Sequence, residues 1–430
     1  MLDPRLYREE VDKIRHGLER RGAKVDLDVM VNIDIEKRKI NVQLDQLKSE
    51  RNAATEQIAQ LKRSKEAGAI ETAQVAIDKT RTLGDEIKIQ QEKFDELETR
   101  FKDMAMLVPN LPHSSVPDGR SAADNRVARE WGQKYAGATK PKHHLDVGKE
   151  LGLFDFERGA KISGSGFPIY MGLGARLERA LLNFFLDTHV ADHGFTEVSP
   201  PFVVNKASMI GTGQLPKFEE DMYTVTADEL YLIPTAEVPV TNMHGNEILD
   251  AVSLPISYVA YSACFRREAG SWGKDTRGFL RLHQFNKVEM VMFSDPAKSY
   301  DLHESLVSYA ENLLQKLGLH YRVLELCAGD MGFGAAKCYD LEVWAPAEER
   351  WLEVSSVSNF EDFQARRANI RTKIGGKTQF VHTLNGSGLA TPRVLVALLE
   401  THQTPEGGLR IPEVLQPYMG GLKEIKAKKK

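Results

Sequence analysis

Cysteine is scarce in this sequence. The 430 residues contain three cysteines, Cys264, Cys327 and Cys338, and these follow no paired spacing. Their number and spacing argue against a disulfide framework and against a cysteine-rich zinc site. We expect small buried side chains at these positions and no zinc; a metal site that one of them shares with His or Glu is the alternative.

Long apolar runs and a large net charge are also missing. The first ten residues lack the apolar core of a secretory signal, and no stretch approaches the length of a membrane span. The formal net charge is -4, so a nucleic-acid partner would have to meet a local basic patch. No glycine-rich phosphate loop of either common type is present. We expect a cytoplasmic globular protein with two or three domains and no membrane partner.

From about Leu27 to Met106 the chain has no proline and few aromatic residues. Apolar residues follow heptad spacing there, interrupted near Ser64 to Gly68, which predicts two long helices paired as an antiparallel coiled coil. Each helix would have about 35 residues and a length of about 50 Å. The apolar positions are Ile33, Ile40, Leu44, Leu47, Ala54, Ile58 and Leu61, and then Leu83, Ile87, Phe94, Leu97 and Phe101.

A two-helix arm buries a thin seam, so we expect it to provide reach rather than core. Its basic residues could bind phosphate along an RNA helix; the alternative is that each is an ordinary solvated residue. The same two interpretations apply to the tail from Lys423 to Lys430. The basic residues of the arm are Arg38, Lys48, Arg51, Lys62, Arg63 and Lys65.

A proline-rich junction, Pro109 to Pro112, predicts a domain boundary, with domains at 1–110 and 111–430. Beyond it, a helix from Gly174 carries an apolar stripe, and short strands and turns then alternate up to a last apolar helix opened by Thr391. This order predicts an α+β fold with a mainly antiparallel sheet flanked by helices. The stripe consists of Leu177, Ala180, Leu181, Phe184 and Phe185.

One segment of this second domain combines charge, aromatic character and strand alternation. Apolar residues alternate into Phe265 and again from Phe285 to Val291, around a polar, glycine-containing stretch, which predicts a strand, a loop and a return strand. Arg266, Arg281, Glu268, Glu289 and Phe285 could then share one surface suited to a nucleotide. The alternative is a surface hairpin whose charges face water.

Three segments in this order resemble the three motifs of the class II aminoacyl-tRNA synthetases. They are the helix leading through Gly194-Phe195 to Pro201 (motif 1, about 174–204), Phe265 to Glu268 with its hairpin (motif 2, about 260–292), and Gly388 to Arg393 with its helix (motif 3, about 386–402). The sequence resembles the seryl-tRNA synthetases of the bacterial type over essentially its whole length. The further segments are the helical arm, Pro234 to Glu237, Gly329 to Gly334, Tyr339 to Trp344, Glu353 to Ser356 and Thr383 to Ala390.

The resemblance implies a serine-tRNA ligase. Such an enzyme converts L-serine and ATP into seryl-adenylate and transfers serine to the 3'-terminal adenosine of tRNA(Ser), and here also of tRNA(Sec). It implies a homodimer that associates through motif 1, and an arm that holds the tRNA. Mg²⁺ would accompany ATP, held in part by Glu353 and Ser356.

The resemblance also implies site residues. Arg266 and Arg393 would be catalytic, at the α- and γ-phosphates, with Glu268 at the adenine amino group and Phe285 stacked on the purine. The ATP site would contain Arg266, Arg267, Glu268, Arg281, Phe285, Glu353, Val354, Ser355, Ser356 and Arg393. The serine site would contain Thr235, Ala236, Glu237, Arg266, Glu289, Asn385 and Ser387.

Some features keep a second interpretation. Taken alone, Thr235 to Glu237 would be a strand end with a surface carboxylate, and His283 is expected to be structural rather than catalytic. Arg267 and Trp272 depart from the family pattern without touching the implied ligands. The rival functions are a non-catalytic synthetase-like RNA-binding protein, a ligase that aminoacylates a carrier protein, and a coiled-coil scaffold. They are disfavoured because the implied ligands and the arm are both present.

Overall fold

The computed structural model describes residues 1–63, 68–135, 140–269 and 278–427. Trp272, Lys65 and the end of the basic tail lie outside these residues. The chain divides into two compact units, of which one contains Leu2–Leu18 and Ala23–Val108 and the other contains Met1, Glu19–Gly22 and Pro109–Lys430.

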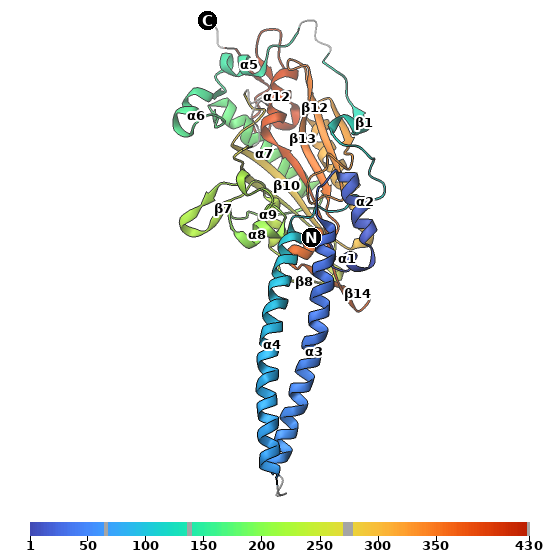
Figure 1. Cartoon of the computed structure of the whole chain (residues 1–430). Coiled ribbons are helices and arrows are strands. Elements are labelled where there is room, and N and C mark those ends of the chain that lie inside the picture. Colours follow the sequence, from blue (N-terminus) through green and yellow to red (C-terminus); the bar gives the residue numbers. More distant parts are fainter. Residues whose placement is uncertain (64–67, 136–139, 270–277, 428–430) are drawn as a thin grey trace. The chain divides into compact units, whose positions relative to one another are not determined.

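Two long helices dominate the first unit, after the short α1 (Leu6–Glu9) and α2 (Val11–Arg21). Helix α3 spans Leu27–Arg63 and α4 spans Ala69–Met106, with 37 and 38 residues, and they lie side by side (Figure 1). Ile40, Leu44 and Ile87 form a buried seam, and Lys93 of α4 pairs with Glu36 of α3 at 2.7 Å. The predicted coiled-coil arm is confirmed, because its heptad positions meet in that seam.

An eight-stranded sheet forms the centre of the second unit. Its neighbours pair antiparallel, except that β4 runs parallel to β9, so the predicted α+β fold with a mainly antiparallel sheet is confirmed. The strand order is β1 (Arg126–Trp131), β11 (Tyr321–Glu325), β12 (Lys337–Ala345), β13 (Arg350–Asn359), β16 (His382–Ala390), β10 (Gln284–Ser294), β9 (Ile256–Phe265) and β4 (Thr196–Glu197).

Smaller sheets and helices surround the central sheet. The small sheets are β8 (Ile248–Leu249) with β14 (Arg371–Ile374) and β15 (Lys377–Phe380), β5 (Val203–Asn205) with β7 (Leu230–Leu232) and β6 (Thr224–Val225), β2 (Phe154–Asp155) with β3 (Ile169–Tyr170), and β17 (Leu409–Arg410) with β18 (Glu424–Ile425). The helices are α5 (His144–Leu151), α6 (Phe156–Ser163), α7 (Leu173–Ala191), α8 (Lys206–Gly211), α9 (Glu237–Asn242), α10 (Ser299–Lys316), α11 (Phe363–Ala368) and α12 (Thr391–Thr401).

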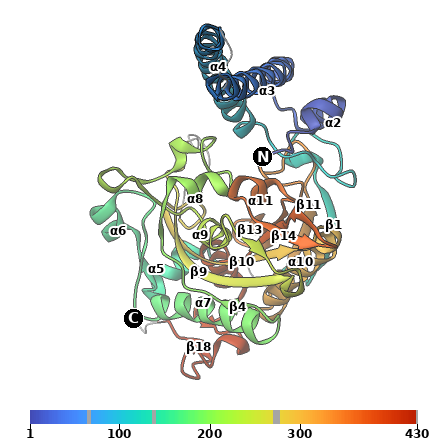
Figure 2. The same cartoon turned by 90° about the horizontal axis from the view of Figure 1, so that it is seen from below.

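Strand β10 divides two environments, because successive side chains of a strand point to opposite faces. Val288, Met290 and Met292 join the large core that α7, α10 and α12 supply. Val291 and Phe293 point the other way and pack in a second cluster with residues of α9 and α11. Figure 2 shows α7 on one side of β9 and β10, with α8 and α9 on the other. Lys287 and Glu289 lie on the same face of β10 as Val291, but they are not part of the apolar cluster that packs against Val291.

The predicted hairpin is confirmed as β9 and β10, which pair antiparallel with Phe265 opposite Gln284. The predicted apolar helix is α7, and Leu177, Ala180, Leu181, Phe184 and Phe185 are all buried. The last predicted helix is α12, which begins at Thr391 with Pro392 in its first turn, where proline's fixed φ and missing N–H are tolerated.

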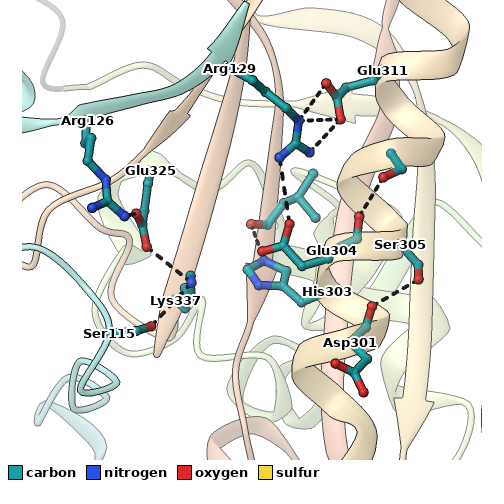
Figure 3. A network of polar contacts seen from close by, with 12 residues as sticks. Ser115, Arg126, Arg129, Asp301, His303, Glu304, Ser305, Glu311, Glu325 and Lys337 are labelled. Carbon is teal, nitrogen blue, oxygen red and sulfur yellow. Dashed lines mark hydrogen bonds and ion pairs between the residues drawn. The ribbon is translucent and has the colours of Figure 1, made fainter.

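An ion-pair network fixes the edge strand β1 to the rest of the sheet (Figure 3). Arg129 donates to both carboxylate oxygens of Glu311 on α10, at 2.9 Å from Nε. Arg126 pairs with Glu325, a buried residue of β11, and Lys337 of β12 lies 3.2 Å from the same carboxylate. Buried Glu325 is thus compensated from two neighbouring strands, as an ionised carboxylate requires.

The seam of the arm generates a stability prediction. We expect Ile87→Ala to weaken the pairing of α3 and α4 by about 2 kcal/mol. The Ile87 side chain is only 9% exposed, so its truncation would leave a cavity in the seam. Amide hydrogen exchange in both helices should then be about 30-fold faster. Ile89→Ala is the matched control on the same helix, since Ile89 is 63% exposed. Equal exchange in both variants would contradict the seam.

Candidate active site

Two adjoining cavities lie beside β9, β10, β13 and β16. The first, of about 490 Å³, is lined by Thr235, Glu237, Glu289 and Asn385 among others, and we call it the Glu237 cavity. The second, of about 290 Å³, is lined by Phe285, Glu353, Ser387 and Arg393 among others, and we call it the Arg393 cavity. Arg266, Glu268, Lys287 and Ser356 line both cavities. These residues therefore mark the junction between them.

A buried polar cluster forms the floor of the Glu237 cavity. Lys287 Nζ donates to Thr235 Oγ1 at 2.8 Å, and Thr235 Oγ1 donates to Glu289 Oε2 at 3.1 Å. Lys287 and Glu289 also form a direct ion pair. All three residues are buried, so the pairing offsets the cost of removing two charges from water.

Glu237 lies at the start of α9 and is buried beside this cluster. Gln364 Nε2 donates to Glu237 Oε1 at 2.6 Å, and the Gln364 carbonyl accepts from Thr383 Oγ1 at 2.7 Å. Burial and the charge of Glu289 raise the pKa of Glu237 to about 7. Two carboxyl groups on one cavity thus have different surroundings, because Glu289 is paired with Lys287 and Glu237 is desolvated beside it.

The Arg393 cavity combines an aromatic ring with guanidinium groups. The Arg266 guanidinium lies over the Phe285 ring at 5.1 Å, and its Nε donates to the Pro234 carbonyl at 3.4 Å. Arg281 Nη1 donates to Glu268 Oε2 at 2.6 Å. The Glu268 backbone has φ +53°, a left-handed conformation that is costly for a non-glycine residue.

Arg393 lies on the first turn of α12, and its side chain reaches two main-chain carbonyls. Its Nη1 donates to the Glu353 carbonyl at 2.8 Å, and its Nε donates to the Leu280 carbonyl at 3.4 Å. Its Nη1 also lies 3.6 Å from Glu353 Oε2. The guanidinium is therefore oriented by the backbone of two segments that line the cavity.

Strand β16 adds hydroxyl and amide groups. Ser387 lies directly opposite Glu289 in the register of β16 and β10, and the pairing shifts by one residue just beyond it. Its hydroxyl oxygen is buried and has no hydrogen-bond partner among the described residues. Ser355 Oγ donates to the Ser387 carbonyl at 2.7 Å and so braces this position.

Most of the residues predicted for the two ligands line one or both cavities. Arg267 does not: its side chain is exposed, and Nη1 donates to the Glu220 carbonyl at 3.2 Å. Ala236 is fully buried at the start of α9 and contributes packing. Val354 and Ser355 line the Arg393 cavity. His283 lines neither cavity, and its Nδ1 lies 3.0 Å from the Arg266 carbonyl.

Sequence reasoning missed Lys287 and Gln364. The signal for Lys287 was present, because residues two apart on a strand share a face and Lys287 lies between Phe285 and Glu289. No local signal could have found Gln364, since α11 reaches Glu237 only through the tertiary fold.

Two groups of side chains could hold a metal ion. Glu353 and Ser356 offer oxygen atoms to the Arg393 cavity, and Asp340 pairs opposite Ser356 in β12. Away from the cavities, four ligand atoms lie within 4.8 Å of one another, from His143, His144, Glu348 and Glu400. We interpret this second group as two hydrogen-bonded pairs: His143 Nε2 lies 2.6 Å from Glu348, and His144 Nδ1 lies 2.9 Å from Glu400. The three cysteines are buried free thiols, as expected.

Three features together define a class II aminoacyl-tRNA synthetase core. They are an antiparallel sheet with a charged hairpin, an arginine at the start of the helix after its last long strand, and a two-part polar cavity. The model of the tRNA synthetase class II core domain (G, H, P, S and T) matches residues 218–402. The model of the seryl-tRNA synthetase N-terminal domain matches residues 1–112.

Individual proteins agree with the two models. The serine-tRNA ligase of Chlorobium phaeovibrioides is 54% identical over 430 residues, covering 98% of each chain. The structure of the seryl-tRNA synthetase of Pyrococcus horikoshii with ATP has a TM-score of 0.92 and 38% identity, and all of each chain is covered. The structure of M. kandleri SerRS in complex with A. aeolicus tRNASec has a TM-score of 0.58 and 19% identity, over 83% of this chain and 71% of that one. The chain belongs to the seryl-tRNA synthetases and is a serine-tRNA ligase of class II.

Within the described ranges, no helix has both the length and the apolar character needed to cross a membrane.

The raised pKa of Glu237 generates a pH prediction. The folded chain binds a proton on Glu237 more tightly than the unfolded chain does, so stability should fall as pH rises from about 4.5 to about 7. Glu237→Gln has no charge at this position, so it should reduce the change in the free energy of unfolding over this pH range by up to about 3 kcal/mol. Urea unfolding at pH 5 and pH 7 measures the difference.

The control for this experiment is Glu406→Gln, at an exposed position. It should leave the pH profile as it is in the wild type. An identical pH dependence in wild type and Glu237→Gln would show that Glu237 keeps an ordinary pKa.

Proposed function

We propose that this serine-tRNA ligase forms seryl-adenylate in the two adjoining cavities, with ATP in the Arg393 cavity and L-serine in the Glu237 cavity. The observation that carries the assignment is the junction, where Arg266 lines both cavities. A guanidinium there can bind the carboxylate of one substrate and the α-phosphate of the other, as bidentate recognition favours.

The Arg393 cavity suits ATP. The Phe285 ring offers a stacking surface for the purine. The Arg266 guanidinium now lies over this ring, and the purine would take its place there. Glu268 would accept from the adenine amino group, and Arg393 would bind the γ-phosphate. Phosphate oxygens are stronger acceptors than the two carbonyls that Arg393 now contacts, so the nucleotide would displace at least one of them.

Mg²⁺ would be held beside the phosphates by Glu353 and Ser356. Their oxygen atoms are the hard ligands that Mg²⁺ prefers, and both line the Arg393 cavity. When bound, the ion would neutralise part of the phosphate charge during the in-line displacement.

The Glu237 cavity suits a small amino acid with a hydroxyl group. Glu289 would accept from the serine hydroxyl. Ser387 lines the Arg393 cavity at the strand position opposite Glu289, and its hydroxyl would pair with serine from across the junction. Thr235, Glu237 and Asn385 complete a polar surface. A substrate that lacks the hydroxyl would leave buried polar groups unpaired, which is a costly outcome.

The transfer step needs tRNA, and we assign its binding to the arm. Arg38, Lys48, Lys62 and Arg63 are exposed on α3 and could follow a phosphate backbone. The M. kandleri relative binds tRNASec, which supports charging of tRNA(Sec) as well as tRNA(Ser). We place the enzyme in the cytoplasm, where these substrates are.

A homodimer through residues 174–204 completes the proposal. Val190 and Val203 within this segment are 40% and 39% exposed, so both apolar side chains are available to such an interface.

The substrate assignment predicts the outcome of ATP–pyrophosphate exchange over a panel of amino acids. Serine should support exchange, and alanine should be worse by on the order of 10⁴-fold in kcat/KM, because it leaves Glu289 and Ser387 without a hydroxyl partner. Exchange that is faster with threonine or alanine than with serine would overturn the assignment.

The division of labour predicts the effect of removing the arm. Deletion of residues 34–97 should leave serine-dependent exchange within a few-fold of the wild type, because no described cavity residue lies in that segment. Charging of tRNA should fall below detection. Equal loss of both activities would contradict the assignment of tRNA binding to the arm.

A further inference from the structure

We propose that Lys287 is a second catalytic cation of serine activation, which acts together with Arg266 at the junction of the two cavities. This inference rests on the proposed placement of serine and ATP. It adds a residue to the reaction centre and gives that residue a role in the transition state.

The position of Lys287 is the first observation. Its alternation on β10 places it on the face of Phe285 and Glu289, and it lines both cavities, as Arg266 does. The reacting atoms must meet at this junction, since serine and ATP occupy different cavities. A cation that faces both cavities lies beside the bond that forms.

The surroundings of the ammonium group are the second observation. Lys287 is 8% exposed, and burying an ammonium group is unfavourable unless partners compensate it. Thr235 Oγ1 and Glu289 are its partners among the described residues, and an ammonium group has three N–H donors. One donor can therefore still bind a substrate oxygen.

The charge balance of the cavity gives the third step. In the free enzyme, Glu289 compensates Lys287. Serine brings its own ammonium group into the cavity that Glu237 and Glu289 line, where this group offsets the negative charge of Glu289. Lys287 is then less fully neutralised by Glu289 and faces the anionic part of the reaction. The serine carboxylate and the α-phosphate meet at the junction, where Lys287 and Arg266 both line the cavities and face these anionic groups.

The reaction itself uses that field. A carboxylate oxygen of serine forms a bond to the α-phosphorus, the bond from this phosphorus to the oxygen bridging to the β-phosphate breaks, and pyrophosphate leaves with that electron pair. No proton moves in this step. Negative charge concentrates on the non-bridging oxygens of the α-phosphate in the transition state, and two fixed cations stabilise it more than the ground state.

The alternative is that Lys287 only positions Glu289 and Thr235 for serine binding. The two roles differ in the kinetic parameter they control. A positioning role changes the affinity for serine, whereas stabilisation of the transition state changes kcat for exchange at saturating serine.

Pyrophosphate exchange with the full-length Lys287→Met and Lys287→Arg variants tests the proposal, with serine affinity measured separately by calorimetry. We expect Lys287→Met to lower kcat about 100-fold while the Kd for serine changes less than about fivefold. Lys287→Arg keeps the charge, so its kcat should be at least tenfold higher than that of Lys287→Met. An unchanged kcat with all of the loss in serine affinity would overturn the proposal.

Lys337→Met is the matched control. Lys337 is also a largely buried lysine paired with a buried carboxylate, Glu325, but it lines neither cavity. It lies in the network of Figure 3. Its replacement should leave kcat within about twofold, although it removes a charge of the same kind.

A double-mutant cycle with Glu289→Gln removes the remaining ambiguity, because an unpaired Glu289 could itself impair the Lys287→Met variant. The proposal requires Lys287→Met to lower kcat by a similar factor in the Glu289→Gln background. Disappearance of the factor there would show that Lys287 only neutralises Glu289. Absence of serine-dependent exchange in the wild type would instead contradict the proposed function, so the two failures can be distinguished.

Discussion

The alternation of side chains along β10 is the constraint on which the rest of the catalytic unit depends. One set of its residues enters the core beneath α7, α10 and α12, and the other set faces α9, α11 and the cavities. The strand thus provides stability and chemistry at the same time. Lys287 and Glu289 can be held as a buried ion pair because the residues between and beside them are fixed by apolar packing on the opposite face.

The two units differ in how they obtain their order. The arm has a narrow apolar seam with ion pairs beside it, and its structure follows from local periodicity along α3 and α4. The catalytic unit obtains its order from strands that are distant in the chain, such as β10 beside β16. An arm of the first kind can be long without a large core, whereas a two-substrate cavity needs the many fixed neighbours of the second kind.

This difference explains which features could be predicted from the sequence. The heptad spacing of Ile40, Leu44 and Ile87 sufficed for the arm, and period-two alternation sufficed for β9 and β10. The resemblance supplied the remaining ligand set, and most of those residues do line the cavities. It did not supply the contact of Gln364 with Glu237, because that contact joins segments 127 residues apart. Nor did it show that Arg267 contacts the Glu220 carbonyl rather than a cavity.

The central place of β10 also limits how the sequence can change. β10 is paired on both sides, by β9 without a register shift and by β16 with one shift between Lys287 and Glu289, so neither edge of it is open. A single insertion or deletion between Gln284 and Ser294 would invert the facing of every later side chain, sending Glu289 toward the helices and Met290 toward the substrate. Length variation in this segment should therefore be excluded, and sequence drift there should proceed by replacement alone.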